Sequence, residues 1–352
     1  MTKIILSFAI TLLISLYNAC QIYATNQYQE KNTYVDTAYL SINDSFFSSA
    51  ADELFSMLHE KSQYNLKRAE FLVEWAFYDG KIEYSDFCNE IDNTTTKLKH
   101  FILKNNLNKY RTAPNYALFL FFTQPSILNE FKSFKYDFED PTGKLNYDKL
   151  FVSKTLKTHS GQCQSLSVLY KILCDELGGH SALAFAPYHL YIKHIGEDGK
   201  WVNFELTSGS LVRDMWMIES MEVQTEAIRN GVFLTALSNK ETIAFMIMHL
   251  LKAYHNKFGI WDSFTLQHTD KVLQILPNFA DALVVKMNIH QYLGLKAKAE
   301  SPKIHQDYIR MHQFEYTRTI QRLDSLGYTQ LSEEDYNRNV AKTIEENKKL
   351  NK

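Results

Sequence analysis

Three side chains in the middle of the chain have the types that thiol-based catalysis requires, and the first of them is a cysteine. Cys163 follows Gly161 and Gln162 and comes just before an amphipathic helical segment, Ser165–Leu177. A side chain at a helix start faces unpaired backbone N–H groups and the positive end of the helix dipole, which favours a thiolate over a thiol. Cys163 is therefore the candidate nucleophile, and such a thiol needs a base and a group that orients the base.

Two predicted strands supply those two groups. Alternation of apolar and polar residues predicts strands over His189–Ile195 and Trp201–Leu206, in which the apolar positions face the core. His189 and Glu205 then lie on the opposite face. They share it only if the strands are joined by three or five residues, or by a bulge. A helix crossing that face would bring Cys163 to His189, with Glu205 orienting the imidazole.

The same residues resemble the core of the transglutaminase-like superfamily, which is related to the papain-type cysteine enzymes. That core has Gly-x-Cys at a helix start, a His on a strand, and usually an Asp after a Trp on the next strand. The corresponding residues here are Gly161, Cys163, His189, Trp201 and Glu205, with Thr207 following. The resemblance implies an α+β fold in which a helix packs on an antiparallel sheet. It also implies acyl transfer at the amide bonds of a protein or peptide substrate, with no metal or organic cofactor.

Two more polar residues are candidates for supporting roles. Gln162 could bind an oxyanion together with the backbone N–H of Cys163. Asn203 is an alternative orienting group for His189, because papain-type enzymes use an asparagine there. The rival to the enzyme interpretation is a catalytically silent scaffold that binds protein partners through its helical flanks. No CxxC or HExxH motif occurs in the sequence, so no zinc site is predicted.

The composition excludes some classes of protein. The 352 residues include 38 basic and 40 acidic side chains, giving a net charge of −2, so nucleic acid is not an expected partner. Hydrophobic residues at 45% and charged residues at 22% exclude wholesale disorder. Only 12 glycines and 6 prolines occur, which favours a helix-rich chain over a many-turned β sandwich.

Residues 1–24 have the pattern of a signal peptide. Lys3 precedes the apolar run Ile4–Leu16, and small residues follow at two candidate cleavage sites, so we expect export to the periplasm, cell envelope or exterior. Cys20 is a candidate lipid-attachment site, and such a lipid would be the chain's only link to a membrane. A structural envelope protein held through Cys20 is a third, weaker interpretation.

Three cysteines remain outside this leader: Cys88, Cys163 and Cys174. Their odd number leaves at least one thiol free. Cys163 and Cys174 are about 16 Å apart if both lie on one helix, too far for a disulfide. Cys174 adjoins the apolar stripe and Cys88 has no basic neighbour in sequence, so Cys163 is predicted to be the reactive thiol.

Helical patterns flank the central segment on both sides. We expect a helical region over 25–145, the transglutaminase-like domain over 146–238, and a second helical region over 239–352. In the last of these, Phe264–Leu276 and Asn278–Leu293 are expected to form a helical hairpin that ends at Gly294. Its second half resembles a tetratricopeptide repeat, which implies a surface for a protein partner. The alternative is an ordinary helical hairpin, because solenoids need about three repeats.

Overall fold

The computed structural model describes residues 42, 44–140, 142–300 and 306–329, with five isolated positions beyond them (334, 338, 342, 345 and 349). The leader and Cys20 lie outside these residues. The helices before the main sheet are α2 (Ser45–Leu58), α3 (Leu66–Phe77), α4 (Tyr84–Lys104), η2 (Leu107–Lys109), α5 (Ala113–Thr123), η3 (Ile127–Asn129), η4 (Tyr147–Leu150), α6 (Val152–Thr158) and α7 (Cys163–Glu176). The helices after it are α8 (Asp214–Ser220), α9 (Thr225–Arg229), α10 (Asn239–Phe258), α11 (Ser263–Ile275), α12 (Ala280–Glu300) and α13 (Gln306–Ser325).

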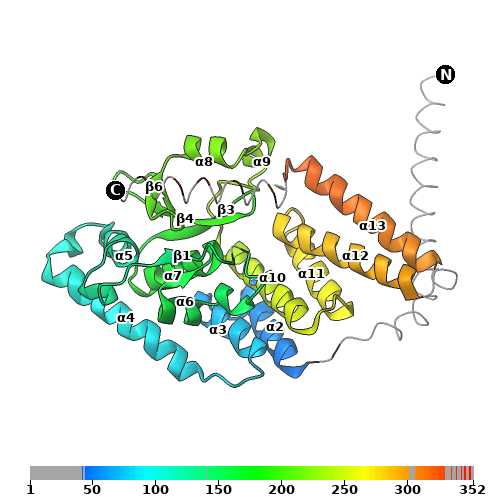
Figure 1. Ribbon diagram of the computed structural model, residues 1–352, viewed down its shortest axis with the longest axis horizontal. Helices are drawn as coiled ribbons and strands as arrows, with labels where there is room; N and C mark the ends of the chain where they lie inside the picture. The colour runs from blue at the N-terminus through cyan, green and yellow to red at the C-terminus, as the bar shows by residue number, and fades with distance from the viewer. Residues whose placement is uncertain are drawn as a thin grey trace, which may run out of the picture.

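An antiparallel sheet of four strands lies among these helices, so the fold is mixed α+β (Figure 1). Its strands follow chain order: β3 (Ser181–Ala186), β4 (His189–Ile195), β5 (Trp201–Glu205) and β6 (Ser210–Val212). A separate parallel pair, β1 (Lys135–Tyr136) and β2 (Ser160–Gly161), leads into α7. The two strands and the helix predicted for this part of the chain are therefore confirmed.

The register of β4 and β5 places alternate residues of both strands on one face. Ile195 pairs with Trp201, which leaves a connection of five residues, one of the two lengths that the predicted arrangement requires. The connection is also anchored from outside the sheet. Arg111 donates to the backbone carbonyl of Glu197 at 2.9 Å, and the backbone N–H of Thr112 donates to the Glu197 carboxylate at 2.7 Å. The start of α5 thus holds the hairpin in this register.

The two faces of the sheet are covered by different helices. Leu190, Ile192 and Phe204 pack with α7 in the main core, while Tyr191 packs in a second core with residues of α8, α9, α12 and α13. Figure 1 shows α7 on one side of the strands and α8 and α9 on the other. The expectation that α7 would cross the face bearing His189 is therefore wrong. The leucines of α7 need an apolar surface, and that surface is the other face.

The N-terminal helices form the main core together with α10. Asp44 caps α2 by accepting from the backbone N–H groups of Phe46 and Phe47 at 2.9 and 3.0 Å. The apolar faces of α2 and α3 pack against α10, and one continuous cluster of buried residues runs from Phe47 to Leu293. This cluster includes residues from all three regions expected from the sequence.

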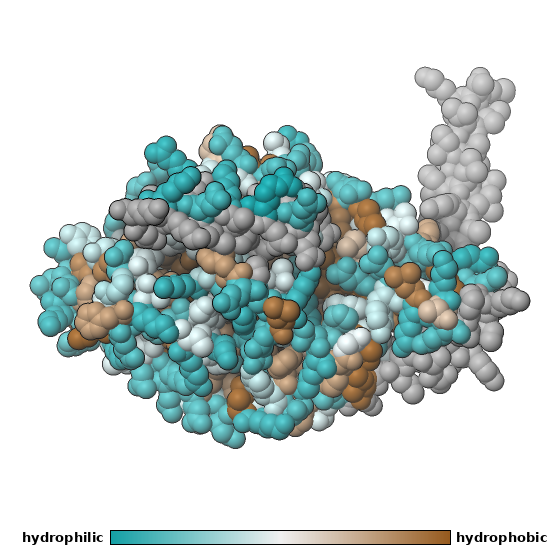
Figure 2. Space-filling view, in the orientation of Figure 1, coloured by the Kyte–Doolittle hydropathy of each residue, from teal (hydrophilic) through white to brown (hydrophobic). Residues whose placement is uncertain are grey.

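The predicted helical hairpin is present as α11 and α12, but α12 does not end at Gly294. It continues to Glu300, and Gly294 lies where a Cβ atom would come within 3.4 Å of the Cβ of His312 on α13. That distance is an ordinary van der Waals contact, so Gly294 lies inside the helix beside α13 and does not act as a stop signal. No helix in the described part of the chain is long and apolar enough to span a bilayer. On the face in Figure 2, apolar residues form small separate patches among polar ones.

Candidate active site

Cys163 is the first residue of α7, and the turn before it is fixed by buried hydrogen bonds. The backbone N–H of Gln162 donates to Ser165 Oγ at 3.0 Å, and Ser165 Oγ donates to the carbonyl of Lys149 at the same distance. Ser165 is fully buried, whereas Cys163 is half-buried. The first turn of α7 therefore holds the thiol at the helix start with the backbone N–H groups unpaired by the helix itself.

Gly161 explains why this turn needs a residue without a side chain. A Cβ atom at this position would contact Thr155 Oγ1, and it would come within 2.6 Å of Ser165 Oγ and 2.9 Å of Thr155 Cγ2. Both neighbours are fully buried, so neither has free space to move into. The glycine lets α6 and the start of α7 pack against one strand.

Replacing Gly161 by alanine should lower the free energy of unfolding by about 1–3 kcal/mol, as overpacking of a core does, and should slow the alkylation of Cys163. Urea unfolding and iodoacetamide labelling would measure the two effects. Adding Thr155→Ala should restore part of both losses, because Thr155 supplies two of the three closest atoms and its hydroxyl has no hydrogen-bond partner among the described residues. A Gly161→Ala protein with wild-type stability and labelling would contradict this account.

The His189 imidazole lies between the other two predicted residues. Its Nε2 is hydrogen-bonded to Glu205 Oε2, and the ring also forms a hydrogen bond with the Cys163 side chain. His189 is the first residue of β4, and Cys163 is the first residue of α7. The start of α7 can therefore reach the His189 ring around the start of the strand. The structure therefore brings Cys163, His189 and Glu205 together from three elements.

Thr207 holds the carboxylate of Glu205 in place, a role that the sequence did not reveal. Its backbone N–H donates to Glu205 Oε1 at 2.8 Å and its hydroxyl donates to the same oxygen at 2.7 Å. The other carboxylate oxygen is thereby left for His189. The signal available in the sequence was the position of Thr207 two residues after Glu205, a spacing at which a side chain can return to the preceding carboxylate.

Replacing Thr207 by valine should cost about 1.5 kcal/mol of stability, because it removes a hydrogen bond to a charged group while keeping the shape of the side chain. We also expect slower alkylation of Cys163, because Glu205 would orient His189 less well. Thr207→Ser keeps the hydroxyl and is the matched control. Equal labelling rates in the valine and serine variants would show that the hydroxyl does not position Glu205.

The electrostatics of the buried pair favour a charged imidazole. Burial lowers the pKa of His189, but the charge of Glu205 and the hydrogen bonds to Cys163 and Glu205 outweigh burial and hold that pKa well above its usual value. Burial raises the pKa of Glu205, and the charge of His189 with the two Thr207 donors outweighs it and lowers that pKa. Near neutral pH the pair is thus imidazolium and carboxylate.

The two supporting candidates have other partners. The side-chain amide of Gln162 donates to the carbonyls of Asp137 and Asp140, so both of its hydrogens are used to hold the 137–140 loop. Asn203 accepts from Lys193 Nζ at 2.8 Å and donates to Asp214 at 2.7 Å. In this structure Gln162 is not available as an oxyanion donor, and Asn203 does not orient His189.

The other two cysteines differ from Cys163, and none of the three forms a disulfide. Cys174 is fully buried, and burial raises the pKa of its thiol to about 12. Cys88 lies beside Tyr84 and close to Arg68, so it does have a basic neighbour, brought from α3. That guanidinium is already paired with Glu53 at 2.6 and 2.8 Å. Cys163 remains the cysteine with an imidazole partner.

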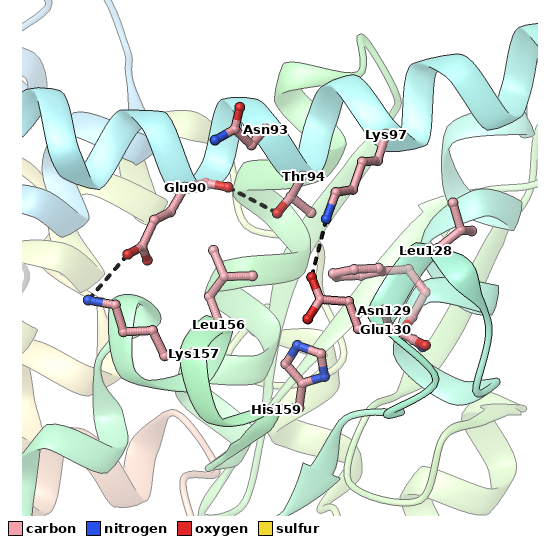
Figure 3. A pocket seen from close by; sticks show the side chains of 11 residues that line it. Glu90, Asn93, Thr94, Lys97, Leu128, Asn129, Glu130, Leu156, Lys157 and His159 are labelled. Atoms are coloured by element: carbon pink, nitrogen blue, oxygen red, sulfur yellow. Dashed lines mark hydrogen bonds and ion pairs between the residues drawn. The ribbon is translucent and has the colours of Figure 1, made fainter.

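A cavity of about 260 Å³ lies between α4, η3 and α6, and none of the three candidate catalytic residues lines it (Figure 3). Its sides are joined by ion pairs of Glu90 with Lys157 at 3.2 Å and of Lys97 with Glu130 at 3.4 Å. We assign it no part in the chemistry of Cys163. In the described residues, no group of three or more His, Cys, Asp or Glu side chains is placed to hold a metal ion.

No protein-family model, curated protein or solved structure matches this chain. The geometry of the site is therefore the basis of the functional proposal.

Proposed function

We propose that this protein is a transglutaminase-like cysteine enzyme that hydrolyses or transfers acyl groups at the amide bonds of a protein or peptide. The observation that carries the proposal is the His189 imidazole, buried and hydrogen-bonded to a thiol at a helix start and to a buried carboxylate. This is the arrangement of nucleophile, base and orienting group that activates a thiol.

The proposed reaction has two halves. The Cys163 thiolate attacks the amide carbon and a C–S bond forms, while backbone N–H groups at the start of α7 bind the oxyanion. The His189 imidazolium gives its proton to the leaving nitrogen as the C–N bond breaks, leaving a thioester on Cys163. His189 then takes a proton from water or from an amine, which attacks the thioester and releases acid or a new amide. Glu205 holds the imidazole throughout.

The thioester can be tested without knowing the substrate, with p-nitrophenyl acetate as the acyl donor. The purified protein should gain one acetyl group on Cys163, detected by peptide mass spectrometry, and the Cys163→Ala variant should not. Adding cadaverine separates the two outcomes of the second half. Formation of N-acetylcadaverine indicates transfer, whereas acetate alone indicates hydrolysis. If Cys163 is acetylated no faster than Cys88, the silent scaffold becomes the better interpretation.

The proposal includes export, based on the signal-peptide pattern of residues 1–24. Intact-mass analysis of the protein made in its own host should show a new N-terminus near Cys20 or Thr25. A palmitate label that is lost in Cys20→Ala would identify a lipoprotein. An unprocessed Met1 on cytoplasmic protein would rule export out.

A further inference from the structure

Two glutamates of α3 that the proposed chemistry does not use are buried side by side. Glu70 and Glu74 lie one helical turn apart, each is 0% exposed, and their carboxyl groups are hydrogen-bonded to each other. Within the described residues neither is paired with a lysine or an arginine. The nearest basic group is His249, whose Nδ1 lies 3.8 Å from Glu70 Oε2. Burial lowers the pKa of His249 to about 3, so this imidazole is neutral near pH 7.

Two carboxylates in such a place cannot both ionise near neutral pH without a large cost. Burial and the charge of Glu74 raise the pKa of Glu70 well above its usual value. Burial also raises the pKa of Glu74, to about 7, against the opposing effect of the Ser153 hydrogen bonds. The proton on Glu74 is therefore the first to leave, near pH 7, so the pair holds two protons below that pH and one above it.

Both glutamates accept hydrogen bonds from the first turn of α6. The backbone N–H of Val152 donates to Glu70 Oε1 at 3.2 Å, and that of Ser153 donates to Glu74 Oε1 at 3.0 Å. The Ser153 hydroxyl donates to the second oxygen of Glu74. Four residues separate α6 from α7, and two of them form β2. The pair thus anchors the segment that leads directly to Cys163.

A second connection reaches the nucleophile turn from the other side. Gln164, which follows Cys163, donates from Nε2 to His249 Nδ1 at 3.0 Å. His249 is buried against Glu70, and Glu70 Oε2 has no hydrogen-bond partner in the described residues. The residues on both sides of Cys163 are therefore connected to the same pair of carboxyls, through α6 on one side and through Gln164 and His249 on the other.

We propose that Glu70 and Glu74 are positioning residues for Cys163: their fully protonated pair holds the α6–α7 junction, and loss of the Glu74 proton releases that junction. The inference rests on the proposed role of Cys163 and adds a regulation by pH to it.

The groups around the pair do not offset the negative charge that loss of the Glu74 proton creates. The titratable groups that act on the pair or on its neighbours are Tyr78, Tyr147, Asp148, His249, Lys252 and Asp281. Lys252 is the cation among them, and it is bound to Asp281 at 2.5 Å. Because the folded pKa values lie above the ordinary 4.5 of glutamate, the stability that the protonated pair contributes is complete below pH 4.5. It is lost as the pH rises through about 7, the pKa of Glu74.

Hydrogen exchange of the amides of residues 153–166 and alkylation of Cys163, each followed between about pH 5 and about pH 8, test the proposal. In the wild type, protection of these amides, corrected for intrinsic exchange, should fall as the pH rises. The pKa of the pair is lower when the junction is released than when it is closed. Amide protection should fall by about tenfold for each unit of that difference in pKa. Glu74→Gln cannot lose this proton and should keep its protection. Glu90→Gln is the matched control, because Glu90 pairs with Lys157 of the same helix α6 at the surface.

Equal pH profiles of protection in the wild type and Glu74→Gln would overturn the proposal. If Glu74→Gln does not fold, Glu70→Gln and the infrared band of a protonated carboxyl in the wild type take its place. Absence of that band near pH 6, where the pair should hold both protons, would also overturn it. Exchange does not require a reactive thiol, so it separates this inference from the proposed function. If Cys163 labels slowly at every pH while protection of the amides still depends on Glu74, only the proposed function is contradicted.

Discussion

Replacing His189 by alanine should slow the alkylation of Cys163 by iodoacetamide by about 10- to 30-fold near pH 7. An ordinary cysteine is only a few per cent thiolate at that pH, so a thiol that loses its imidazolium neighbour loses most of its reactive form. Peptide mass spectrometry after timed labelling of the folded protein measures the rate at each cysteine. Glu205→Gln should give a smaller decrease, because the imidazole remains but is less often charged.

The other two cysteines are internal controls for this experiment. Cys174 is fully buried and should label only after unfolding, and Cys174→Ala should leave the Cys163 rate unchanged while lowering stability. Cys88 is partly exposed and should label at a rate that does not respond to His189→Ala. If Cys163 and Cys88 label at the same rate in the wild type, the imidazole does not activate Cys163.

Replacing Glu205 by alanine should lower the free energy of unfolding by about 3 kcal/mol or more, because it leaves His189 without its partner in a buried site. Glu205 is 2% exposed and His189 is 9% exposed, so solvent can replace little of the lost interaction. The double variant His189→Leu/Glu205→Leu should recover most of the loss, since apolar side chains need no partner there. Urea unfolding measures all three proteins, and a double variant less stable than Glu205→Ala would contradict this explanation.

The difference in stability between the wild type and Glu205→Ala should depend on pH in both directions. The lowered pKa of Glu205 gives a contribution that is present above pH 4.5 and is lost as the pH falls through the lowered value. The raised pKa of His189 gives a contribution that is complete below pH 6.5 and is lost as the pH rises through the raised value. The pair therefore contributes most between about pH 4.5 and 6.5, and a difference that is flat across pH would show that the two groups are not charged.

The geometry of the hairpin could be predicted from residue order because a strand alternates its side chains strictly. Given apolar Ile192 and Phe204 on the core face, His189 and Glu205 had to share the other face once the connection had five residues. The face that α7 covers was not predictable in the same way. His189 is the first residue of its strand, so a helix on the other face of the sheet can reach its ring around the start of the strand. The alternation of side chains along a strand does not show which face the helix covers.

Interactions between distant segments were the ones that the sequence did not reveal. Gln162 looked like an oxyanion donor because its neighbour is the nucleophile, but its amide is bound to carbonyls 22 and 25 positions earlier. Glu70 and Glu74 fit an ordinary amphipathic helix in the sequence. They are buried because α6, about 80 residues later, and α10 close over them. Neither feature leaves a local pattern of residue types.

The packing of α10 against α2 and α3 has a consequence for how the chain folds. The hairpin that carries His189 and Glu205 joins residues 16 positions apart and can form early, whereas Lys257 of α10 donates to the carbonyl of Phe77 from 180 positions away. At a ribosomal rate of about 5–20 residues per second, the apolar faces of α2 and α3 wait roughly 10–35 s for α10 to be made. During that interval these apolar faces lack the helix that covers them in the folded protein, and exposed apolar surface of this kind favours aggregation.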